Sequence, residues 1–441
     1  MNQKTIQEVR PNPQVEIRLP DGRVFSGPRG TTIGDFLLHL PDWETKPLMG
    51  AVVNGTLREL TFPIEIEANV MPLTMADNDG ARIYRRSLTF VLEAAFEELF
   101  PGSYLSVDHS VSSGGYFCEL KDSEQLTANQ VQALEDHMKA IVNKDIPLER
   151  KQVPLQEAVN YFNKKGQTDK VQLLKYRKKD YLILYALGDH LDYFHGYMVP
   201  STGFLRWFDL VPADSGFVLH FTRRSQPTIL QPLTYSQRLL STFRQYGSWL
   251  ARLGIENVGA LNDSIESGKI REVILVSEAL HEQKIAEIAT QIVNRIPRPH
   301  LVLISGPSSS GKTTFSKRLS IQLLAQGISP FPFEMDNYFI NREDTPKNEK
   351  GEFDFEALQA LNIQLMANHL RQLINGDEVQ LRHYNFKSGL NEPGKTVKLQ
   401  KDNLVIIEGI HGLNPGLLPD FPTGQDSDDI QEEICPYKEG A

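Results

Sequence analysis

LVLISGPSSSGKTTFSKRLSIQLLA, residues 301–325, decides the fold of the second half of this 441-residue chain. The apolar run Leu301–Ser305 is typical of a buried parallel strand, and the pattern from Thr314 to Ala325 is helical. Between them, Gly306–Thr313 fits the spacing G-x-x-x-x-G-K-T, in which glycines let successive backbone N–H groups face a phosphate. The sequence therefore predicts a phosphate loop between a strand and a helix of an α/β fold.

This loop supplies most of the candidate nucleotide contacts. We expect Lys312 to reach the β- and γ-phosphates of ATP or GTP, and the Thr313 hydroxyl to ligate Mg²⁺. A chance match without a nucleotide site is the alternative, but strand, loop and helix all agree with the motif. The residues expected to surround the phosphates are small or polar: Gly306, Ser308, Ser309, Ser310, Gly311, Lys312, Thr313 and Thr314.

Two carboxylates follow apolar runs further along the chain. Phe331–Met335 predicts a strand that carries Asp336 to the carboxyl end of the sheet, where open α/β folds bind ligands. We interpret Asp336 as a base that accepts the proton of an attacking hydroxyl, with a surface turn or helix cap as the alternative. The run Leu404–Ile407 leads into Glu408, which would act through a water on Mg²⁺ or be held by local backbone N–H groups.

Four segments in this region resemble the uridine kinase and phosphoribulokinase family, in the family's order. They are Asp336-Asn337-Tyr338-Phe339, Phe353-Asp354-Phe355, Tyr384-Asn385-Phe386 and Leu404–Gly409. The resemblance implies a kinase with catalytic Asp336 and Lys312 that phosphorylates a small, nucleoside-like substrate. It also implies a substrate contact from Phe339, sugar contacts from Asp354, and aromatic walls from Tyr384 and Phe386, although such a pair would equally fit a hydrophobic core.

The first 75 residues predict a small fold of two hairpins around one helix. Val15–Leu19 alternates like a strand, and Pro20–Gly22 supplies turn chemistry. Thr31–Thr32 can cap a helix through residue 40, and Ala51–Val53 before Asn54-Gly55 predicts another strand and tight turn. This β-grasp pattern resembles the TGS domain of threonyl-tRNA synthetases and some GTPases.

The next region mixes a predicted helix, Leu88–Phe100, with strand-like runs such as Tyr181–Leu187 and Gly216–Thr222. Val199–Gly203 and Arg85–Ala95 resemble the second additional domain of threonyl-tRNA synthetase, which edits misacylated tRNA. Editing there uses a His-x-x-x-His pair and a Cys-x-x-x-His pair. The matching positions here cannot form such a site, so we expect neither zinc nor editing: Arg86, Phe90, Phe194 and Met198.

Two further features of this region have more than one interpretation. We interpret His190 and His195 as ordinary polar or half-buried histidines. The alternative is a pair of replacement metal ligands, but no cysteine or carboxylate stands at a recognisable metal-ligand spacing. A basic cluster around Tyr176 would either contact RNA or form a solvated face. The cluster consists of Lys164, Lys165, Lys175, Arg177, Lys178 and Lys179.

Composition and charge limit the class of protein. The net charge of −10 argues against a nucleic-acid binder over the whole chain, so RNA stays a local hypothesis. Cys118 and Cys435 are the only cysteines, which excludes a disulfide framework and agrees with a reducing compartment. Because no signal peptide or bilayer-spanning apolar run stands out, we expect a cytoplasmic protein without a membrane partner.

We therefore expect an α/β and α+β multidomain chain. Its helical connector should contain amphipathic helices at Leu233–Leu253 and at Ser277–Ile296, the second capped by Ser277. The expected parts are a TGS-like β-grasp domain at 14–75, a synthetase-like α+β region at 80–228, the connector at 229–298, a P-loop kinase-like domain with a doubly wound parallel sheet at 299–420, and an acidic tail at 421–441.

The same order of domains is seen in a bacterial family of TGS-domain nucleoside kinases. In that family further strands and an arginine-bearing lid follow the segment that matches Glu408-Gly409. Residues 410–441 offer no such lid, so we expect a truncated or frameshifted C-terminus and impaired turnover. An ATP-binding regulatory protein and an RNA- or tRNA-interacting protein are the alternatives, and the oligomeric state is left open.

Overall fold

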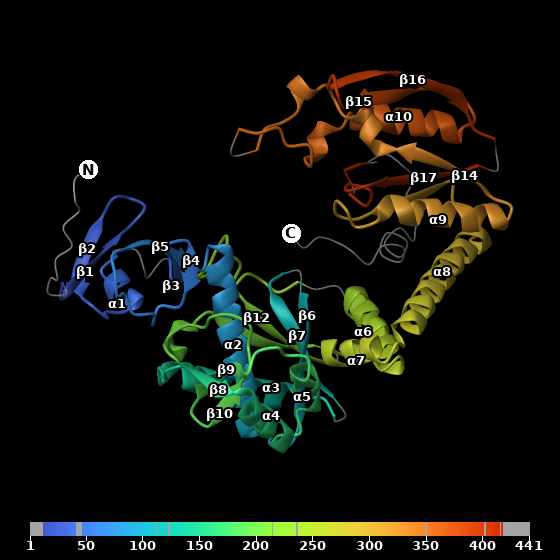
Figure 1. Cartoon of the computed structure of the whole chain (residues 1–441). Coiled ribbons are helices and arrows are strands. Elements are labelled where there is room, and N and C mark those ends of the chain that lie inside the picture. Colours follow the sequence, from blue (N-terminus) through green and yellow to red (C-terminus); the bar gives the residue numbers. More distant parts are fainter. Residues whose placement is uncertain are drawn as a thin grey trace, which may run out of the picture. The chain divides into compact units, whose positions relative to one another are not determined.

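The computed structural model of the chain divides into two compact units, residues 1–235 and 236–441. The structure describes residues 12–40, 46–111, 113–121, 124–213, 215–234, 237–348, 351–400, 403–414 and 416–417. The acidic tail expected at 421–441 lies outside the described residues. Both units combine helices with more than one sheet (Figure 1). None of the helices in these ranges combines the length and apolar character that crossing a bilayer requires.

A five-stranded sheet in the order β2-β1-β5-β3-β4 opens the first unit. The two predicted hairpins are confirmed, because β1 pairs antiparallel with β2 and β3 pairs antiparallel with β4. Asn54 and Gly55 join the second pair with φ of 47° and 79°, the turn conformation that Asn-Gly favours. The strands are β1 (Gln14–Arg18), β2 (Val24–Pro28), β3 (Leu48–Val53), β4 (Thr56–Arg58) and β5 (Ala68–Thr74).

The helix predicted between these hairpins is present but shorter than expected. Helix α1 (Ile33–Leu37) begins after Thr32, whose side chain accepts a hydrogen bond from the Asp35 N–H group. It ends at Leu37 rather than at residue 40. Its Ile33, Phe36 and Leu37 side chains pack into the core of the five-stranded sheet.

The rest of the first unit is built around helix α2 (Asn78–Leu99), which begins ten residues before the predicted Leu88. Most of its apolar residues are buried in the largest core of the unit. Strand β9 occupies Tyr181–Leu187 as predicted. The other elements are β6 (Tyr104–Val111), β7 (Gly115–Lys121), α3 (Ala128–Asn143), β8 (Glu149–Pro154), α4 (Leu155–Lys164), α5 (Thr168–Leu174), β10 (His190–Asp192), η1 (Thr202–Phe204), β11 (Phe208–Ala213) and β12 (Gly216–Phe221).

These strands form two sheets, in the orders β10-β9-β8 and β11-β12-β7-β6. The strand predicted at Gly216–Thr222 is therefore β12, and all of its residues are buried. Strand β10 is short and lies at the edge of its sheet, antiparallel to β9. This pairing fixes where His190 and Asp192 lie.

Gly80 lies in the first turn of α2, where the helix approaches the backbone of Thr74. A Cβ atom at Gly80 would lie 1.9 Å from the Thr74 carbonyl oxygen. We therefore expect Gly80→Ala to lower the free energy of unfolding by about 1–3 kcal/mol through overpacking. This effect outweighs the helix propensity of alanine, which favours it over glycine by about 1 kcal/mol.

The matched control is Gly247→Ala in α6 (Gln237–Arg252), where the new methyl group would meet nothing within 4 Å. It should stabilise the protein slightly. Urea denaturation followed by circular dichroism measures both variants. Equal stabilisation of the two would contradict the close approach at Gly80.

The second unit begins with three helices, α6, α7 (Val258–Glu266) and α8 (Ile270–Asn294). Helix α6 lies within the predicted Leu233–Leu253. The predicted cap at Ser277 is wrong, because α8 begins seven residues earlier and the Ser277 hydroxyl donates to the Val273 carbonyl oxygen inside the helix, at 2.7 Å. A serine whose side chain bonds four residues back has no capping role.

A parallel sheet in the order β13-β17-β14 forms the centre of the second unit. Strand β13 (Leu301–Ser305) matches its prediction, and β14 (Ser329–Glu334) and β17 (Asn403–Gly409) each lie within two residues of theirs. Helix α9 (Lys312–Ala325) directly follows the phosphate loop. Helices α8 and α9 lie on one side of the sheet and α10 (Ile363–Ile374) on the other (Figure 1).

The central strand β17 is buried on both faces. Leu404 and Ile406 pack with α8 and α9, whereas Val405 and Ile407 pack with α10. This alternation explains the continuous apolar run, because a parallel strand covered by helices on both faces must be apolar at every position. The C-terminal half of α8 therefore belongs to the core of this unit by its packing.

The remaining described elements lie beside the sheet. An antiparallel hairpin, β15 (Glu378–Asn385) and β16 (Leu390–Lys398), packs next to η2 (Met335–Tyr338). Two further short 3-10 helices are η3 (Arg342–Asp344) and η4 (Leu358–Ala360).

Candidate active site

The phosphate loop leaves the carboxyl end of β13 and enters α9. Gly306 is buried, whereas residues 307–311 are exposed. Ser309 and Gly311 have φ of 60° and 89°, so the loop curls through left-handed backbone positions just before the helix. The N-terminus of α9, which carries positive partial charge, therefore opens onto an exposed loop, and this arrangement favours a phosphate ligand.

Thr313 and Glu408 are in direct contact at this end of the sheet. The Thr313 hydroxyl donates a hydrogen bond of 2.6 Å to Glu408 Oε1. Glu408 comes from β17 and stands opposite Ile304 of β13 and Glu334 of β14 in the strand register. The fold thus brings together two residues, 95 positions apart, that the sequence proposed as magnesium ligands.

Asp336 lies directly beyond β14, in η2, and interacts electrostatically with Glu408 and Lys312. Partial desolvation raises its pKa above the ordinary value, as do the Glu408 and Glu334 carboxylates, while Lys312 opposes them. The residue is nevertheless exposed at the surface, so a ligand can reach it. Lys312 donates to the Pro307 carbonyl oxygen at 2.8 Å, which folds its side chain back over the loop.

The aromatic residues predicted to bind substrate contact one another in a row, but their rings differ in how far they are exposed. The Phe339 ring contacts Tyr384 at 5.5 Å and Phe355 at 5.8 Å between centroids, and Tyr384 contacts Phe386 at 5.0 Å. Tyr384 is 1% exposed and Phe386 is 61% exposed. Tyr384 therefore lies in the core behind Phe386, so of this pair Phe386 has the surface that a ligand could stack on.

Asp354 is held by its own loop. Its N–H group donates to the Pro346 carbonyl oxygen at 2.7 Å, and its Oδ1 accepts from the Glu356 N–H group at 3.0 Å. The ring of the neighbouring Phe355 packs against the Phe339 ring, which holds this loop beside the aromatic residues. Asp354 thus lies one residue from the aromatic contacts.

Asn391 was not singled out in the sequence, although it fixes the segment that carries Asp336. Its side-chain amide donates to the carbonyl oxygens of Asn337 and Phe339, at 2.9 and 2.8 Å. Arg382 in turn donates from Nε to Asn391 Oδ1 at 2.5 Å. One feature of the sequence could have indicated this role, namely an asparagine within β16. Asparagine is depleted in strands, so its presence in one suggests a specific side-chain contact.

In the first unit, the four positions that correspond to the editing pairs form an apolar and cationic group. Phe90 and Phe194 meet edge to face at 5.8 Å, and Met198 is 1% exposed. The Arg86 guanidinium donates to the Tyr197 carbonyl oxygen at 2.5 Å. These side chains lack a nucleophile and a general base, so they cannot support hydrolysis in the manner of the editing pairs.

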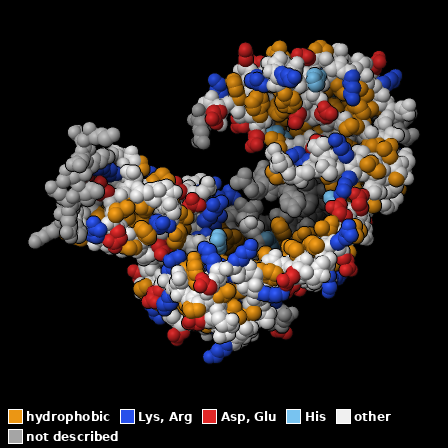
Figure 2. Space-filling view, in the orientation of Figure 1, with side chains coloured by type: hydrophobic (Ala, Val, Ile, Leu, Met, Phe, Trp, Pro, Cys, Tyr) orange, Lys and Arg blue, Asp and Glu red, His pale blue; other side chains and the backbone are white. Residues whose placement is uncertain are grey.

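The basic cluster makes local contacts. Lys165 pairs with Glu97 at 2.5 Å, Lys175 lies over the Tyr176 ring, and Arg177 donates to the Tyr181 carbonyl oxygen at 2.7 Å. On the face of this unit that Figure 2 displays, acidic side chains lie among the basic ones. Contact with RNA stays a prediction.

Comparison with known proteins identifies similarities in both halves. Residues 301–416 match the model of the Phosphoribulokinase / Uridine kinase family. The chain is 30% identical over 198 residues to a threonine–tRNA ligase of Desulforamulus reducens, covering 45% of this chain and 31% of the ligase. Threonine–tRNA ligase 2 of Bacillus subtilis is 28% identical over 204 residues, covering 46% and 32%. The chain thus spans about a third of the length of these relatives.

Among solved structures, one titled as a possible uridine kinase from Bacillus stearothermophilus is 26% identical. It covers 34% of this chain and 91% of that chain, with a TM-score of 0.28. The family model and the ligase relatives confirm both resemblances expected from the motifs: the ligase similarity lies in the N-terminal half and the kinase-family match in the C-terminal part.

Proposed function

We propose that this chain transfers the γ-phosphate of ATP, or of GTP, to a hydroxyl group of a nucleoside or a similar sugar-bearing molecule, with Mg²⁺ as the metal. The kinase-family match of residues 301–416 supports phosphoryl transfer as the reaction class. The observation that carries the proposal is the contact of Thr313 with Glu408 at the mouth of the phosphate loop. The electrostatic influence of Lys312 and Glu408 on Asp336 supports a single site.

The residues present fit Mg²⁺ and a triphosphate. A hydroxyl and a carboxylate oxygen 2.6 Å apart are hard oxygen donors of the kind that Mg²⁺ prefers, and they lie beside the helix end expected to hold phosphates. When bound, Mg²⁺ supplies positive charge to the phosphoryl oxygens. Thr313 and Glu408 would hold it, Glu408 through a water.

The protein residues have distinct roles in this proposal. Loop N–H groups and Lys312 would bind the β- and γ-phosphates and neutralise charge as it develops. Asp336 would accept the proton of the attacking hydroxyl, and its raised pKa makes it a better base than an ordinary aspartate. Asn391 is a positioning residue, because it holds the backbone on both sides of Tyr338.

The acceptor would bind on the side of Phe339 and Phe386. The exposed Phe386 ring would stack on a base, and Asp354 would accept hydrogen bonds from sugar hydroxyls. Tyr384 would support Phe386 from behind rather than contact the acceptor.

For the front half, we propose a TGS-like domain at 14–75 and an editing-inactive synthetase-like domain at 80–228. The similarity to threonine–tRNA ligases supports the two domains. The side chains of Arg86, Phe90, Phe194 and Met198 support the loss of editing. The same similarity favours RNA contact as a second candidate function, with the basic cluster as its surface.

Transfer of labelled γ-phosphate from ATP to a panel of nucleosides tests the proposal. We expect one or more nucleosides to accept label, and chelation of Mg²⁺ to abolish the transfer. Binding of Mg-ATP without transfer to any acceptor would favour the regulatory alternative. Salt-sensitive retention of the chain on immobilised RNA, with no transfer, would favour the RNA-binding alternative.

A further inference from the structure

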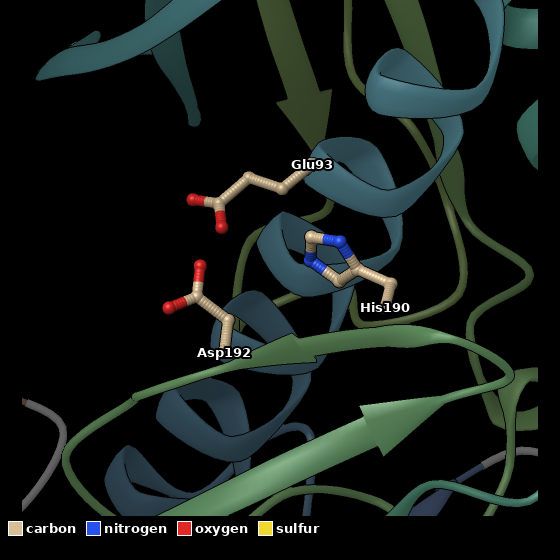
Figure 3. A group of neighbouring side chains, drawn as sticks. All are labelled: Glu93, His190 and Asp192. Atoms are coloured by element: carbon tan, nitrogen blue, oxygen red, sulfur yellow. The ribbon is translucent and has the colours of Figure 1, made fainter. Parts of the chain in front are cut away.

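Three side chains of the first unit direct hydrogen-bond acceptors toward one point. Glu93 comes from α2, and His190 and Asp192 come from the edge strand β10 (Figure 3). One ligand atom from each lies within 4.8 Å of the other two. Figure 3 shows the two carboxylates facing each other and one imidazole nitrogen turned toward them.

The hydrogen bond on the other side of His190 decides what this nitrogen can do. His190 Nδ1 lies 2.6 Å from Glu97 Oε2, and an ionised carboxylate can only accept, so Nδ1 carries the proton. Desolvation opposes ionisation of Glu97, but hydrogen bonds from Lys165 and His190 outweigh it and lower the Glu97 pKa. Burial lowers the pKa of His190, which favours the neutral ring. Nε2 is then a lone-pair donor.

His190 Nε2 is a buried atom for which no hydrogen-bond partner is found among the described residues. The His190 side chain is 9% exposed and the Asp192 side chain 1% exposed. Leaving such an acceptor unsatisfied costs about 1–3 kcal/mol, so an orphaned buried nitrogen beside two carboxylates needs an explanation. A cation at the common point would satisfy all three side chains at once.

The charge around Glu93 is unbalanced. The charged groups that act on it are Asp192, Asp169 and Lys170, so three carboxylates share one ammonium group. Lys170 pairs directly with Asp192, and Asp169 accepts a hydrogen bond from the Tyr104 hydroxyl at 3.1 Å. Burial and the adjoining Asp192 carboxylate raise the pKa of Glu93 well above its ordinary value. A divalent cation that displaces the proton from Glu93 would bring these four side chains to neutrality.

We propose that Glu93, His190 and Asp192 bind a divalent cation of the first transition row, such as Zn²⁺ or Co²⁺. An imidazole nitrogen with two carboxylates suits these metals, whereas Mg²⁺ and Ca²⁺ prefer oxygen donors alone. Ligands about 2.0–2.1 Å from a tetrahedral zinc ion lie about 3.4 Å apart, so small side-chain rotations would close the present arrangement. Glu97 would act as the outer carboxylate that orients the histidine ligand.

The proposed metal site is not the zinc and editing site that the sequence predicts to be absent. The expectation of no zinc rested on Arg86, Phe90, Phe194 and Met198, and none of these is a ligand here. With three protein ligands, further coordination positions stay available to water, as in open metal sites.

The test uses the full chain, freed of metal by chelation and kept without nucleotide, so that the phosphate loop does not contribute. Titration with Co²⁺ should give one equivalent with visible d–d absorption, displaced by Zn²⁺. His190→Gln should weaken binding by about 100-fold or more, and Glu97→Gln by about 10- to 100-fold. His195→Gln is the matched control, since it lies nearby but is exposed, and it should bind as the unmodified chain does.

A second variant separates a metal ligand from a structural residue. Glu93→Gln keeps the side-chain size and resembles protonated Glu93, but the amide cannot ionise to bind a cation. Metal binding should therefore be lost while the unfolding temperature of the metal-free chain holds or rises. The proposal is overturned if the unmodified chain binds Co²⁺ no more tightly than the His190→Gln variant. It is equally overturned if Glu93→Gln lowers the unfolding temperature and leaves metal affinity unchanged.

Discussion

Turnover should fall by about two to four orders of magnitude when Asp336 is replaced by asparagine. The amide keeps the size of the side chain but cannot accept the proton of the attacking hydroxyl. Mg-ATP affinity should change little, because the proposed phosphate and metal contacts come from Lys312, Thr313 and Glu408. Initial rates of labelled phosphate transfer, together with nucleotide affinity by calorimetry, measure both quantities.

The pH dependence gives an independent check on the same residue. A base works only in its ionised form, so kcat/KM should fall as the pH drops through the raised pKa of free Asp336. The fall should therefore begin at a higher pH than an ordinary aspartate would give, and the asparagine variant should lose this limb. Asp344→Asn, an exposed aspartate nearby in η3, is the control and should leave the rate within about twofold. An undiminished rate in Asp336→Asn would refute the assigned role.

Lys312→Ala should remove most of the stabilisation that nucleotide gives to this chain. A ligand at 100 times its Kd stabilises the native state by about 2.7 kcal/mol, which raises the unfolding temperature measurably. Without the ammonium group the β- and γ-phosphates lose their charged partner, so the shift with Mg-ATP or Mg-GTP should nearly vanish. Phosphate transfer should fall as well, because the same charge stabilises the transferring group.

Lys317→Ala serves as the control for this experiment. Lys317 is exposed on α9, five residues beyond Lys312, and its removal should leave the nucleotide-dependent shift intact. Thermal unfolding at millimolar nucleotide compares the variants. No shift in the unmodified chain would contradict the phosphate-loop interpretation itself, whereas equal shifts in both variants would contradict only the role of Lys312.

The parts of the fold that the sequence predicted well are those with strong local patterns. The runs at Leu301–Ser305 and Tyr181–Leu187 match β13 and β9 in full, because every position of these strands is buried or half-buried and nearly every residue is apolar. The start of α8 was missed, since Ser277 looks like a cap in sequence and only the helix shows it bonded to Val273. Local propensity cannot separate these two uses of a serine.

Part of the candidate active site could be predicted from the sequence, because motifs show which residues lie at the ends of strands. Thr313, Asp336 and Glu408 each follow or flank a recognisable segment, and parallel strands bring their ends to one edge. The burial of Tyr384 behind Phe386 depends on the β15–β16 hairpin, which no local pattern specified. The cluster of Glu93, His190 and Asp192 was beyond the sequence for a similar reason, because a helix and an edge strand about 100 residues apart supply its members.

The order β13-β17-β14 has a consequence for how the second unit is made. Among the described strands of this sheet, β17 leaves the ribosome last, yet it lies between the other two and provides both sets of pairings. Until residue 409 has been synthesised, β13 and β14 have no central neighbour, and their apolar edges are open to wrong partners. The strand that carries Glu408 and ends in Gly409 thus completes the sheet and the edge of the candidate site in one event. A nascent chain would therefore gain the proposed nucleotide site late and abruptly.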